Sequence, residues 1–223
     1  FYRNPGADQM LNPANINEDY FSHIRIFHHG SISMIERNPL LATLKAIKLT
    51  KKNNGLVSFD PNYRPAIWPQ PKIALNRIHQ GFKYADIIKT SNEDLPFISG
   101  DTNIRRGAQK ILKSSNAIAV IVTLAQNGCY FLTKKGLESA VSGFKVKVVE
   151  VTGAGDAFSA SMLADLLSFT NSEVSNLSKT AWEKVLIRAN AAGALACTKY
   201  GAIPAMPTKA EVKAFLAKNQ AVV

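Results

Sequence analysis

Short apolar and β-branched runs alternate with helical patterns along this chain, and this alternation constrains the fold more than any other feature. Three such runs predict strands, at residues 25–29, 56–59 and 85–89. Strands separated by helical segments favour a mainly parallel α/β sheet that helices cover on both faces. Ligands of such sheets bind beyond the carboxyl ends of the strands, where the strand-to-helix turns gather.

Further elements are expected between and after these strands. Pro39 stands near the start of a helix in which Leu40, Leu44 and Ile47 follow helical spacing. The remaining elements are expected as a helix over about 103–113, a strand over 117–124, a hairpin strand over 129–133, a β-rich run over 144–149, and helices after residue 156 and over about 182–196. The 223 residues suffice for one large core, and no repeat or interdomain linker divides them.

The most specific chemistry lies in the turn Thr152-Gly153-Ala154-Gly155-Asp156, which follows the β-rich run and precedes an apolar helix. Glycines let the backbone turn sharply and let a ligand approach it closely. The first turn of the helix offers unpaired N–H groups and the positive end of the helix dipole, which suits a phosphate in transfer. A carboxylate at Asp156 can accept the proton of an attacking hydroxyl. Taken alone, the pentapeptide fits a plain strand-to-helix turn equally well.

Two commoner phosphate-binding motifs are absent from the sequence. No GxxxxGK[ST] run occurs, which excludes a P-loop and the lysine that belongs to it. A dinucleotide-binding GxGxxG is also missing, because Phe158 stands where its third glycine would be.

The net charge of +11 does not by itself indicate a nucleic-acid partner. The lysines are spread along the chain, and Lys45, Lys48 and Lys52 have the spacing of the solvated face of one helix. No motif of aromatic and basic residues accompanies the charge, so binding to nucleic acid is disfavoured. A basic surface would, however, help to attract a nucleotide.

Cysteine usage and hydropathy predict a cytoplasmic protein without a membrane partner. Cys129 and Cys197 lie in different apolar segments without metal-ligand spacing, so we expect two buried reduced thiols. No apolar stretch approaches the ~20 residues that cross a bilayer. Residues 1–6 also lack the features of a signal peptide.

The glycine turn, extended to Phe158, resembles the second signature of the PfkB (ribokinase-like) carbohydrate kinases. Further segments are similar to the fructokinase branch of that family, in the same order along the chain. These segments are 1–5 with 7–8, 30–33, 59–65 with Trp68, 123–124 with Gly128, 189–194 and 201–207. The resemblance covers essentially the whole chain, and six ordered matches are far more specific than one glycine turn.

The resemblance implies a ribokinase-like three-layer αβα fold with a mainly parallel central sheet, formed by one kinase domain over residues 1–223. The implied reaction transfers the γ-phosphate of ATP to a sugar hydroxyl, with Mg²⁺ and often K⁺. D-Fructose, converted to fructose 6-phosphate, is the expected acceptor. Another sugar of the family, such as 2-keto-3-deoxygluconate or ribose, and a non-catalytic fructokinase-like scaffold remain as alternatives.

The resemblance places the catalytic groups of the family on the glycine turn, with Asp156 as the general base that deprotonates the primary hydroxyl. The backbone of Gly153, Ala154 and Gly155 is the implied anion hole. Glu150 replaces the aspartate that often precedes this turn, near the monovalent-cation site of the family. A requirement for K⁺ is therefore left open.

Three residues are implied to contact the sugar side of the reaction. Asn62 and Arg64 fall where the family places groups near the sugar and the transferred phosphate. A guanidinium at Arg64 suits that place because it pairs well with phosphate, although a surface arginine in a Pro-rich turn would give the same pattern. Arg3 corresponds to an arginine that fructokinases direct from their lid toward the substrate.

The residues that the resemblance places at the nucleotide are Ser91, Thr123, Gly128, Asn190 and Gly193. In the loop after Thr123, Ala125 stands where a glycine is common. The polar Asn190 on an apolar helix needs a partner, either the ligand or neighbouring backbone. Asp94 replaces the usual glutamate of the N/S-x-x-E element and is implied to contact the metal through water. A plain helix cap by Ser91 is the alternative.

The largest departure from the family is at the front of the chain. The glycine-rich sugar-binding signature, the first strand and most of the β-lid do not occur in this sequence, and residues 1–10 are expected as a remnant of a lid strand. The sequence therefore predicts an N-terminally incomplete kinase with impaired sugar affinity, since the lid excludes water. A homodimer would depend on that lid, because lids of the family often form dimers.

Overall fold

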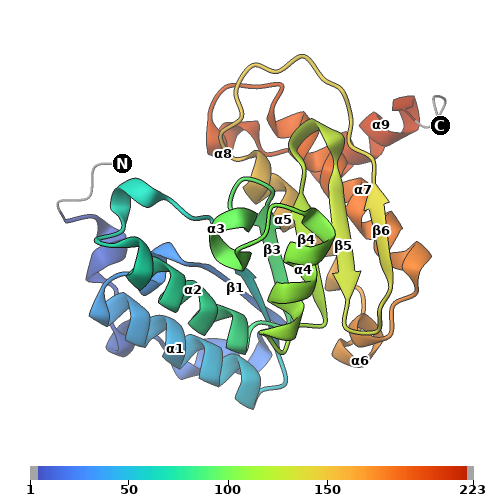
Figure 1. The fold of residues 1–223 in the computed structure, drawn as a ribbon. Helices are drawn as coiled ribbons and strands as arrows, with labels where there is room; N and C mark the ends of the chain where they lie inside the picture. The colour runs from blue at the N-terminus through green and yellow to red at the C-terminus, as the bar shows by residue number, and fades with distance from the viewer. Residues whose placement is uncertain (1–4, 220–223) are drawn as a thin grey trace. The chain divides into compact units, whose positions relative to one another are not determined.

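The computed structural model describes residues 5–219 and contains a six-stranded sheet with the strand order β1-β2-β3-β4-β5-β6 (Figure 1). The strands are β1 (Ile26–Gly30), β2 (Leu56–Asp60), β3 (Ile87–Ser91), β4 (Ala119–Thr123), β5 (Cys129–Thr133) and β6 (Glu138–Val141). β1 pairs in parallel with β2, and β2 pairs in parallel with β3. Residues 124–128 are too few for a parallel crossover, so β5 returns antiparallel to β4. The predicted α/β class with a mainly parallel sheet is confirmed.

Nine α-helices accompany the sheet in the described residues. They are α1 (Arg37–Lys52), α2 (Pro71–Tyr84), α3 (Leu95–Ser99), α4 (Ile104–Lys113), α5 (Ala154–Leu166), α6 (Asn171–Ser175), α7 (Lys179–Ala196), α8 (Ala202–Ala205) and α9 (Lys209–Asn219). The chain forms two compact units, one of Phe1–Val122 with Phe131–Gly136 and the other of Thr123–Tyr130 with Leu137–Val223. The single kinase domain stays a prediction.

In the first unit, α1 packs on β1 and β2, and α2 packs on β2 and α3 (Figure 1). Helix α2 was not among the elements that the sequence predicted. Its signals are nevertheless present, because Pro71 occupies the first helical turn and Ala74, Ile78 and Phe82 are buried at four-residue spacing. The five residues of β2 are all buried, which agrees with a strand inside a parallel sheet.

His29, near the end of β1, is buried in a row of aromatic rings. Its ring centroid lies 5.6 Å from that of Phe27 and 4.7 Å from that of Phe59. Its Nδ1 contacts the carbonyl oxygen of Gly30, which only accepts, so Nδ1 carries the proton. Nε2 is buried without a partner among the described residues. Burial in this apolar site, with a smaller contribution from the charge of His28, lowers the pKa of His29 from 6.5 to about 4.

This lowered pKa predicts a loss of stability in mild acid. The unfolded chain takes up a proton at His29 below pH 6.5, whereas the folded chain takes it up only below about pH 4. The free energy of unfolding should therefore fall by about 1.4 kcal/mol per pH unit inside this window. Urea unfolding of the protein and of His29→Phe, compared across the window, measures this term apart from other titrating groups. An equal pH dependence in both proteins would contradict it.

The core of the second unit lies where α5, α7 and α9 meet. Ala157 from α5, Ala191, Ala192 and Ala196 from α7, and Val212 from α9 are buried together. These small side chains allow α5 and α7 to pack closely. The apolar helix predicted after Asp156 and the helix predicted over about 182–196 are both confirmed, as α5 and α7.

Residues 144–149, expected as a β-rich run, form no strand. The side chains of Val148 and Val149 are 58% and 37% exposed, so the segment lies at the surface. The N–H groups of Val149 and Glu150 instead donate to the carbonyl oxygen of Cys197 at the end of α7, at 2.8 and 3.3 Å. The backbone of this segment therefore hydrogen-bonds to the end of a helix and not to a neighbouring strand. The residue types alone do not reveal this choice of partner.

Two further expectations are corrected. Residues 7–10 form the 3-10 helix η1 (Ala7–Met10) rather than a remnant of a lid strand, because the Gly6 N–H binds the side chain of Gln9 and starts a turn; residues 1–4 lie outside the described part. Both cysteines are free, but only Cys129 is buried and Cys197 is half-buried.

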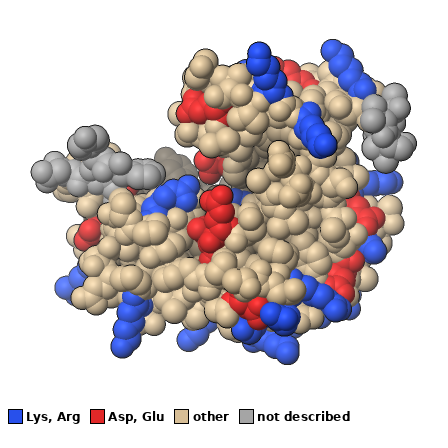
Figure 2. Space-filling model, turned by 45° about the horizontal axis from the view of Figure 1, so that its top comes forward, with Lys and Arg blue, Asp and Glu red and all other residues tan. Residues whose placement is uncertain are grey.

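The charge distribution agrees with the expectation of scattered lysines. Figure 2 shows Lys and Arg side chains separated by uncharged surface on the face that it draws, without a continuous basic stripe. Across residues 5–219, no helix has both the length and the apolar character needed to pass through a bilayer.

Candidate functional site

The glycine turn of the second unit leads directly into α5. Gly153 has a φ of 85°, which a residue with a side chain adopts only with strain. A Cβ at this position would also lie 3.1 Å from Cε of Met206 and 3.2 Å from Cα of Ala202. The turn therefore requires glycine for its conformation and for the close approach of α8.

The N-terminus of α5 presents backbone N–H groups that can bind an anion. The N–H of Ala154 donates to the carbonyl oxygen of Val151 at 3.2 Å, so this donor is already used. The N–H groups of Gly153, Gly155 and Asp156 have no hydrogen-bond partner within residues 5–219. Together with the helix dipole these groups can bind an anion, and the anion hole of Gly153, Ala154 and Gly155 stays a prediction.

The carboxylate of Asp156 is exposed beside these amides. The next three residues along α5, Ala157, Phe158 and Ser159, are buried and anchor the helix in the core. In the described part of the chain the Asp156 side chain makes no hydrogen bond or ion pair. It is therefore available to a reactant that reaches the turn.

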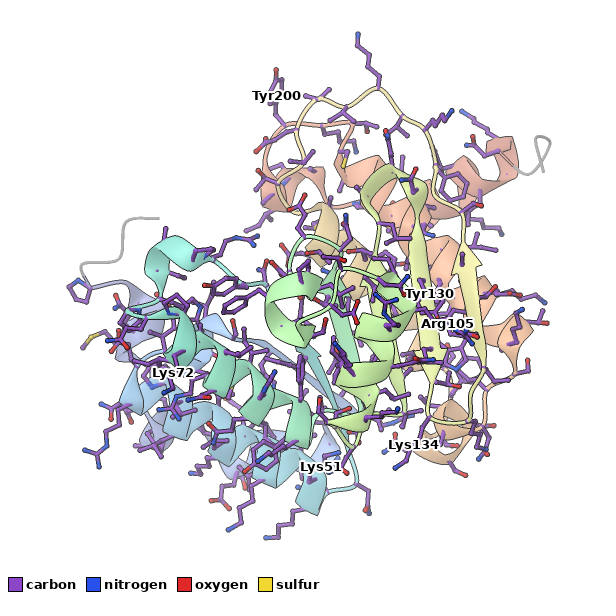
Figure 3. All side chains as sticks on the ribbon, in the orientation of Figure 1. Lys51, Lys72, Arg105, Tyr130, Lys134 and Tyr200 are labelled. Carbon is purple, nitrogen blue, oxygen red and sulfur yellow. The ribbon has the colours of Figure 1, made fainter. Side chains whose placement is uncertain are left out.

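Glu150 ties the glycine turn to the loop that precedes α8. Hydrogen bonds from the side chain of Thr152 and from the N–H of Gly201, the latter 2.7 Å long, hold the pKa of Glu150 below its ordinary value. Next to Gly201, Tyr200 points away from the fold and is 79% exposed (Figure 3). The described residues contain no group of three or more metal-ligating side chains.

The loop between β4 and β5 packs on the backbone that follows β6. Gly128 has a φ of 96°, and its carbonyl oxygen accepts the N–H of Leu124 at 2.7 Å. Ala125 has a φ of 50°, which explains on physical grounds why glycine suits this position. Thr123, at the end of β4, is half-buried beside this loop.

Asn190 on α7 holds the chain after β6. Its side chain is buried and donates to the carbonyl oxygens of Val141 and Ser142 at 3.2 and 3.1 Å. The partner that this polar group needs is therefore neighbouring backbone. Gly193, one turn later, faces the carbonyl oxygen of Ala154, which a Cβ would approach to 3.2 Å. Direct contact of these two residues with a nucleotide stays a prediction.

In the first unit, polar residues gather where β1, β2 and β3 end. Asp60 closes β2 and binds Lys89 of β3 through a 2.7 Å ion pair whose two side chains are only 8% and 7% exposed. This pair was not predicted from the sequence, although a charged residue at the end of one buried strand and a second inside the next are its signal. Removing either partner would leave a buried charge unpaired, so the two side chains stay together. The pair therefore joins β3 to the end of β2, which leads into Asn62 and Arg64.

Asp94 lies at the start of α3 and contacts the loop after β2. Its carboxylate accepts the N–H of Tyr63 at 3.2 Å, and its own N–H donates to Oγ of Ser91 at 3.1 Å. Burial raises the pKa of Asp94, and the Tyr63 N–H partly opposes this rise. The Ser91 hydroxyl closes the turn before α3, whose N-cap is Asp94, and contact of Ser91 with the nucleotide stays a prediction. The metal role of Asp94 stays a prediction.

The structure thus brings the sequence-predicted residues together within each unit. The glycine turn and Gly193 share the second unit with Thr123, Gly128 and Asn190, while the first unit gathers Asn62, Arg64, Ser91 and Asp94 at one edge of its parallel strands. Arg3 lies outside the described residues.

Comparisons with known proteins show which family the chain resembles. The model of the pfkB family carbohydrate kinases matches residues 1–209. Probable fructokinase-2 from Arabidopsis thaliana is 39% identical over 97% of this chain and 64% of its own length. Fructokinase-2 from Solanum lycopersicum is 38% identical over 97% of this chain and 65% of its own length. The chain therefore spans slightly less than two thirds of the length of these relatives.

Solved structures with a similar fold include kinases with bound ligands. A fructokinase from Xylella fastidiosa with bound ATP has a TM-score of 0.91 and 28% identity, over 99% of this chain and 70% of that one. A fructokinase from Vibrio cholerae O395 with fructose, ADP and calcium ion bound has a TM-score of 0.84 and 33% identity, over 95% of this chain and 66% of that one.

Proposed function

The chain belongs to the PfkB family of carbohydrate kinases, and we propose that it transfers the γ-phosphate of ATP to D-fructose. The observation that carries the proposal is the exposed carboxylate of Asp156 beside three unbonded backbone amides at the start of α5. Such an arrangement provides a proton acceptor and an anion site within one helical turn. The fructokinases that resemble the chain support fructose as the acceptor.

In the proposed mechanism each group of the turn has one task. The carboxylate of Asp156 takes the proton from the primary hydroxyl of the sugar as the hydroxyl oxygen bonds to the γ-phosphorus. The bond between that phosphorus and the bridging oxygen breaks, and ADP leaves. The N–H groups of Gly153 and Gly155 stabilise the charge on the transferred phosphoryl oxygens. Arg64 and Asn62 are the proposed contacts to the sugar and the phosphate.

The described residues offer few protein ligands for Mg²⁺. Mg²⁺ usually binds one or two carboxylates together with substrate phosphates and waters, rather than a dedicated protein cage. The carboxylate of Asp94 already uses one oxygen for the Tyr63 N–H, so the phosphates of ATP and water would supply most ligands of the ion. When bound, the ion would neutralise charge on the phosphates of ATP.

A sugar panel tests the proposed function. The chain is incubated with ATP and Mg²⁺, and ADP release and sugar phosphate are measured with D-fructose, D-ribose and 2-keto-3-deoxygluconate in turn. We expect fructose phosphate to form fastest. Faster reaction with another sugar would replace the acceptor. Background phosphorylation with every sugar, despite measurable ATP binding, would instead support a non-catalytic scaffold and contradict the proposal.

A further inference from the structure

The loop of residues 60–64 in the first unit is bound at each of its central backbone positions. The carbonyl oxygen of Pro61 accepts hydrogen bonds from the hydroxyl and, at 3.4 Å, the N–H of Ser31. The N–H of Asn62 donates to the carboxylate of Asp60 at 3.1 Å. Asn62 itself has a φ of 42°, a conformation that needs such support in a residue with a side chain.

Two residues at and near the start of α3 contact Tyr63, the next residue of this loop. The Asp94 carboxylate accepts the Tyr63 N–H at 3.2 Å. The ring of Tyr63 stacks on that of Phe97, one turn further along α3, with centroids 4.1 Å apart and planes inclined by 5°. Backbone and side chain of Tyr63 are therefore both fixed by one short helix.

Arg64 follows Tyr63 directly and contacts its backbone. Its guanidinium is exposed, and its Nη1 donates to the carbonyl oxygen of Tyr63 at 3.0 Å. Arg64 hence follows a residue whose N–H donates to Asp94 and whose carbonyl oxygen accepts the Arg64 guanidinium. The charges of Asp60, Lys89 and Arg64 all act on the Asp94 carboxylate, which is partly withdrawn from water. Hydrogen bonds to such a carboxylate are stronger than those between neutral groups.

We propose that Asp94 is a positioning residue, which fixes loop 60–64 through the Tyr63 N–H and so sets the orientation of Asn62 and Arg64. This role rests on the proposed function in one respect only, namely which ligands Asn62 and Arg64 bind. It differs from the metal contact implied by the sequence, because the hydrogen bond to Tyr63 needs only an acceptor oxygen, whereas loss of the carboxylate charge weakens a contact to Mg²⁺.

Two variants at this position separate the two roles. Asp94→Asn retains an oxygen that can accept the Tyr63 N–H but loses the charge, and Asp94→Ala loses both. Glu93→Gln is the matched control, because Glu93 is exposed and has no partner among the described residues. The first measurement is hydrogen exchange of the Tyr63 amide by NMR, which needs neither ATP nor sugar.

We expect the Tyr63 amide to exchange at least roughly tenfold faster in Asp94→Ala than in the unmodified chain, and to stay protected in Asp94→Asn and Glu93→Gln. In the kinase assay Asp94→Ala should raise the KM for the sugar, whereas the KM of Asp94→Asn should stay close to that of the unmodified chain. The Mg²⁺ concentration for half-maximal rate should not change in either variant. Unchanged protection in Asp94→Ala would overturn the proposal. An equal rise in the KM for the sugar in Asp94→Ala and Asp94→Asn, together with a raised Mg²⁺ requirement, would also overturn the proposal. Asp94 would then be a metal ligand.

The exchange measurement also separates this proposal from the proposed function. If the unmodified chain phosphorylates no sugar but Asp94→Ala still loses protection of the Tyr63 amide, the positioning role of Asp94 stands. Only the proposed kinase activity is then refuted. If Asp94→Ala fails to fold, exchange and Mg²⁺ dependence in Asp94→Asn still decide, since faster exchange or a raised Mg²⁺ requirement there contradicts positioning.

Discussion

Replacing Asp156 by asparagine is expected to lower kcat by about 10²–10⁴-fold, the range that a positioned general base contributes. Asparagine has nearly the same shape and leaves the first turn of α5 in place, but its amide cannot accept the hydroxyl proton. Binding of ATP should stay almost unchanged, because the amides of the glycine turn remain. ADP release in the presence of D-fructose gives kcat, and calorimetry with a non-hydrolysable ATP analogue gives the affinity.

Asp19→Asn is the control for this substitution. Asp19 is exposed and its carboxylate has no partner among the described residues, so the variant carries the same change of charge at an indifferent site. Its kcat should equal that of the unmodified chain. Turnover by Asp156→Asn within about tenfold of the control would remove Asp156 as the base.

Gly128→Ala is expected to cause the largest loss of stability, by more than about 4 kcal/mol. A Cβ at this position would lie 2.0 Å from the carbonyl oxygen of Val141 and 2.4 Å from the backbone nitrogen of Gly143. Backbone atoms on both sides cannot give way as a flexible side chain can. The loop after β4 would therefore separate from the chain that Asn190 holds, and nucleotide affinity should fall as well.

Gly136→Ala provides the matched control in a urea-unfolding experiment. Gly136 also has a positive φ, 81°, but a Cβ there would have no atom within 4 Å. Only the conformational strain of about 1–2 kcal/mol should then remain. Equal losses of stability in the two variants would show that the contact with residues 141–143 does not decide the packing of this loop.

The parts of the fold that follow from local sequence pattern were predictable. The strands near 25–29, 56–59 and 85–89 and the helix after Asp156 were expected, because apolar periodicity and the glycine turn specify them. The run over 144–149 was misassigned, since its valines have strand propensity but its backbone binds the end of α7. Such competition is decided by tertiary contacts and leaves no local signal.

The candidate site shows the same division. Asp156 and the amides around it lie within one turn, so the sequence places them together. The need of Asn190 for a partner was foreseeable from its place on an apolar helix, but not the choice of the backbone after β6. The bond of Asp94 to Tyr63 joins residues 31 positions apart, and the pair of Lys89 with Asp60 joins residues 29 apart. Contacts at such separations depend on the strand register, which residue types alone do not specify.

Backbone amide shifts measured by NMR during titration with Mg²⁺ and a non-hydrolysable ATP analogue test the central claim most directly. The amides of Gly153, Gly155 and Asp156 should shift strongly with the analogue and hardly at all with adenosine, which lacks the phosphates. The Ala154 amide, already bonded to Val151, should respond less. Saturation with the analogue while these three amides stay unmoved would show that the turn before α5 does not receive the phosphate.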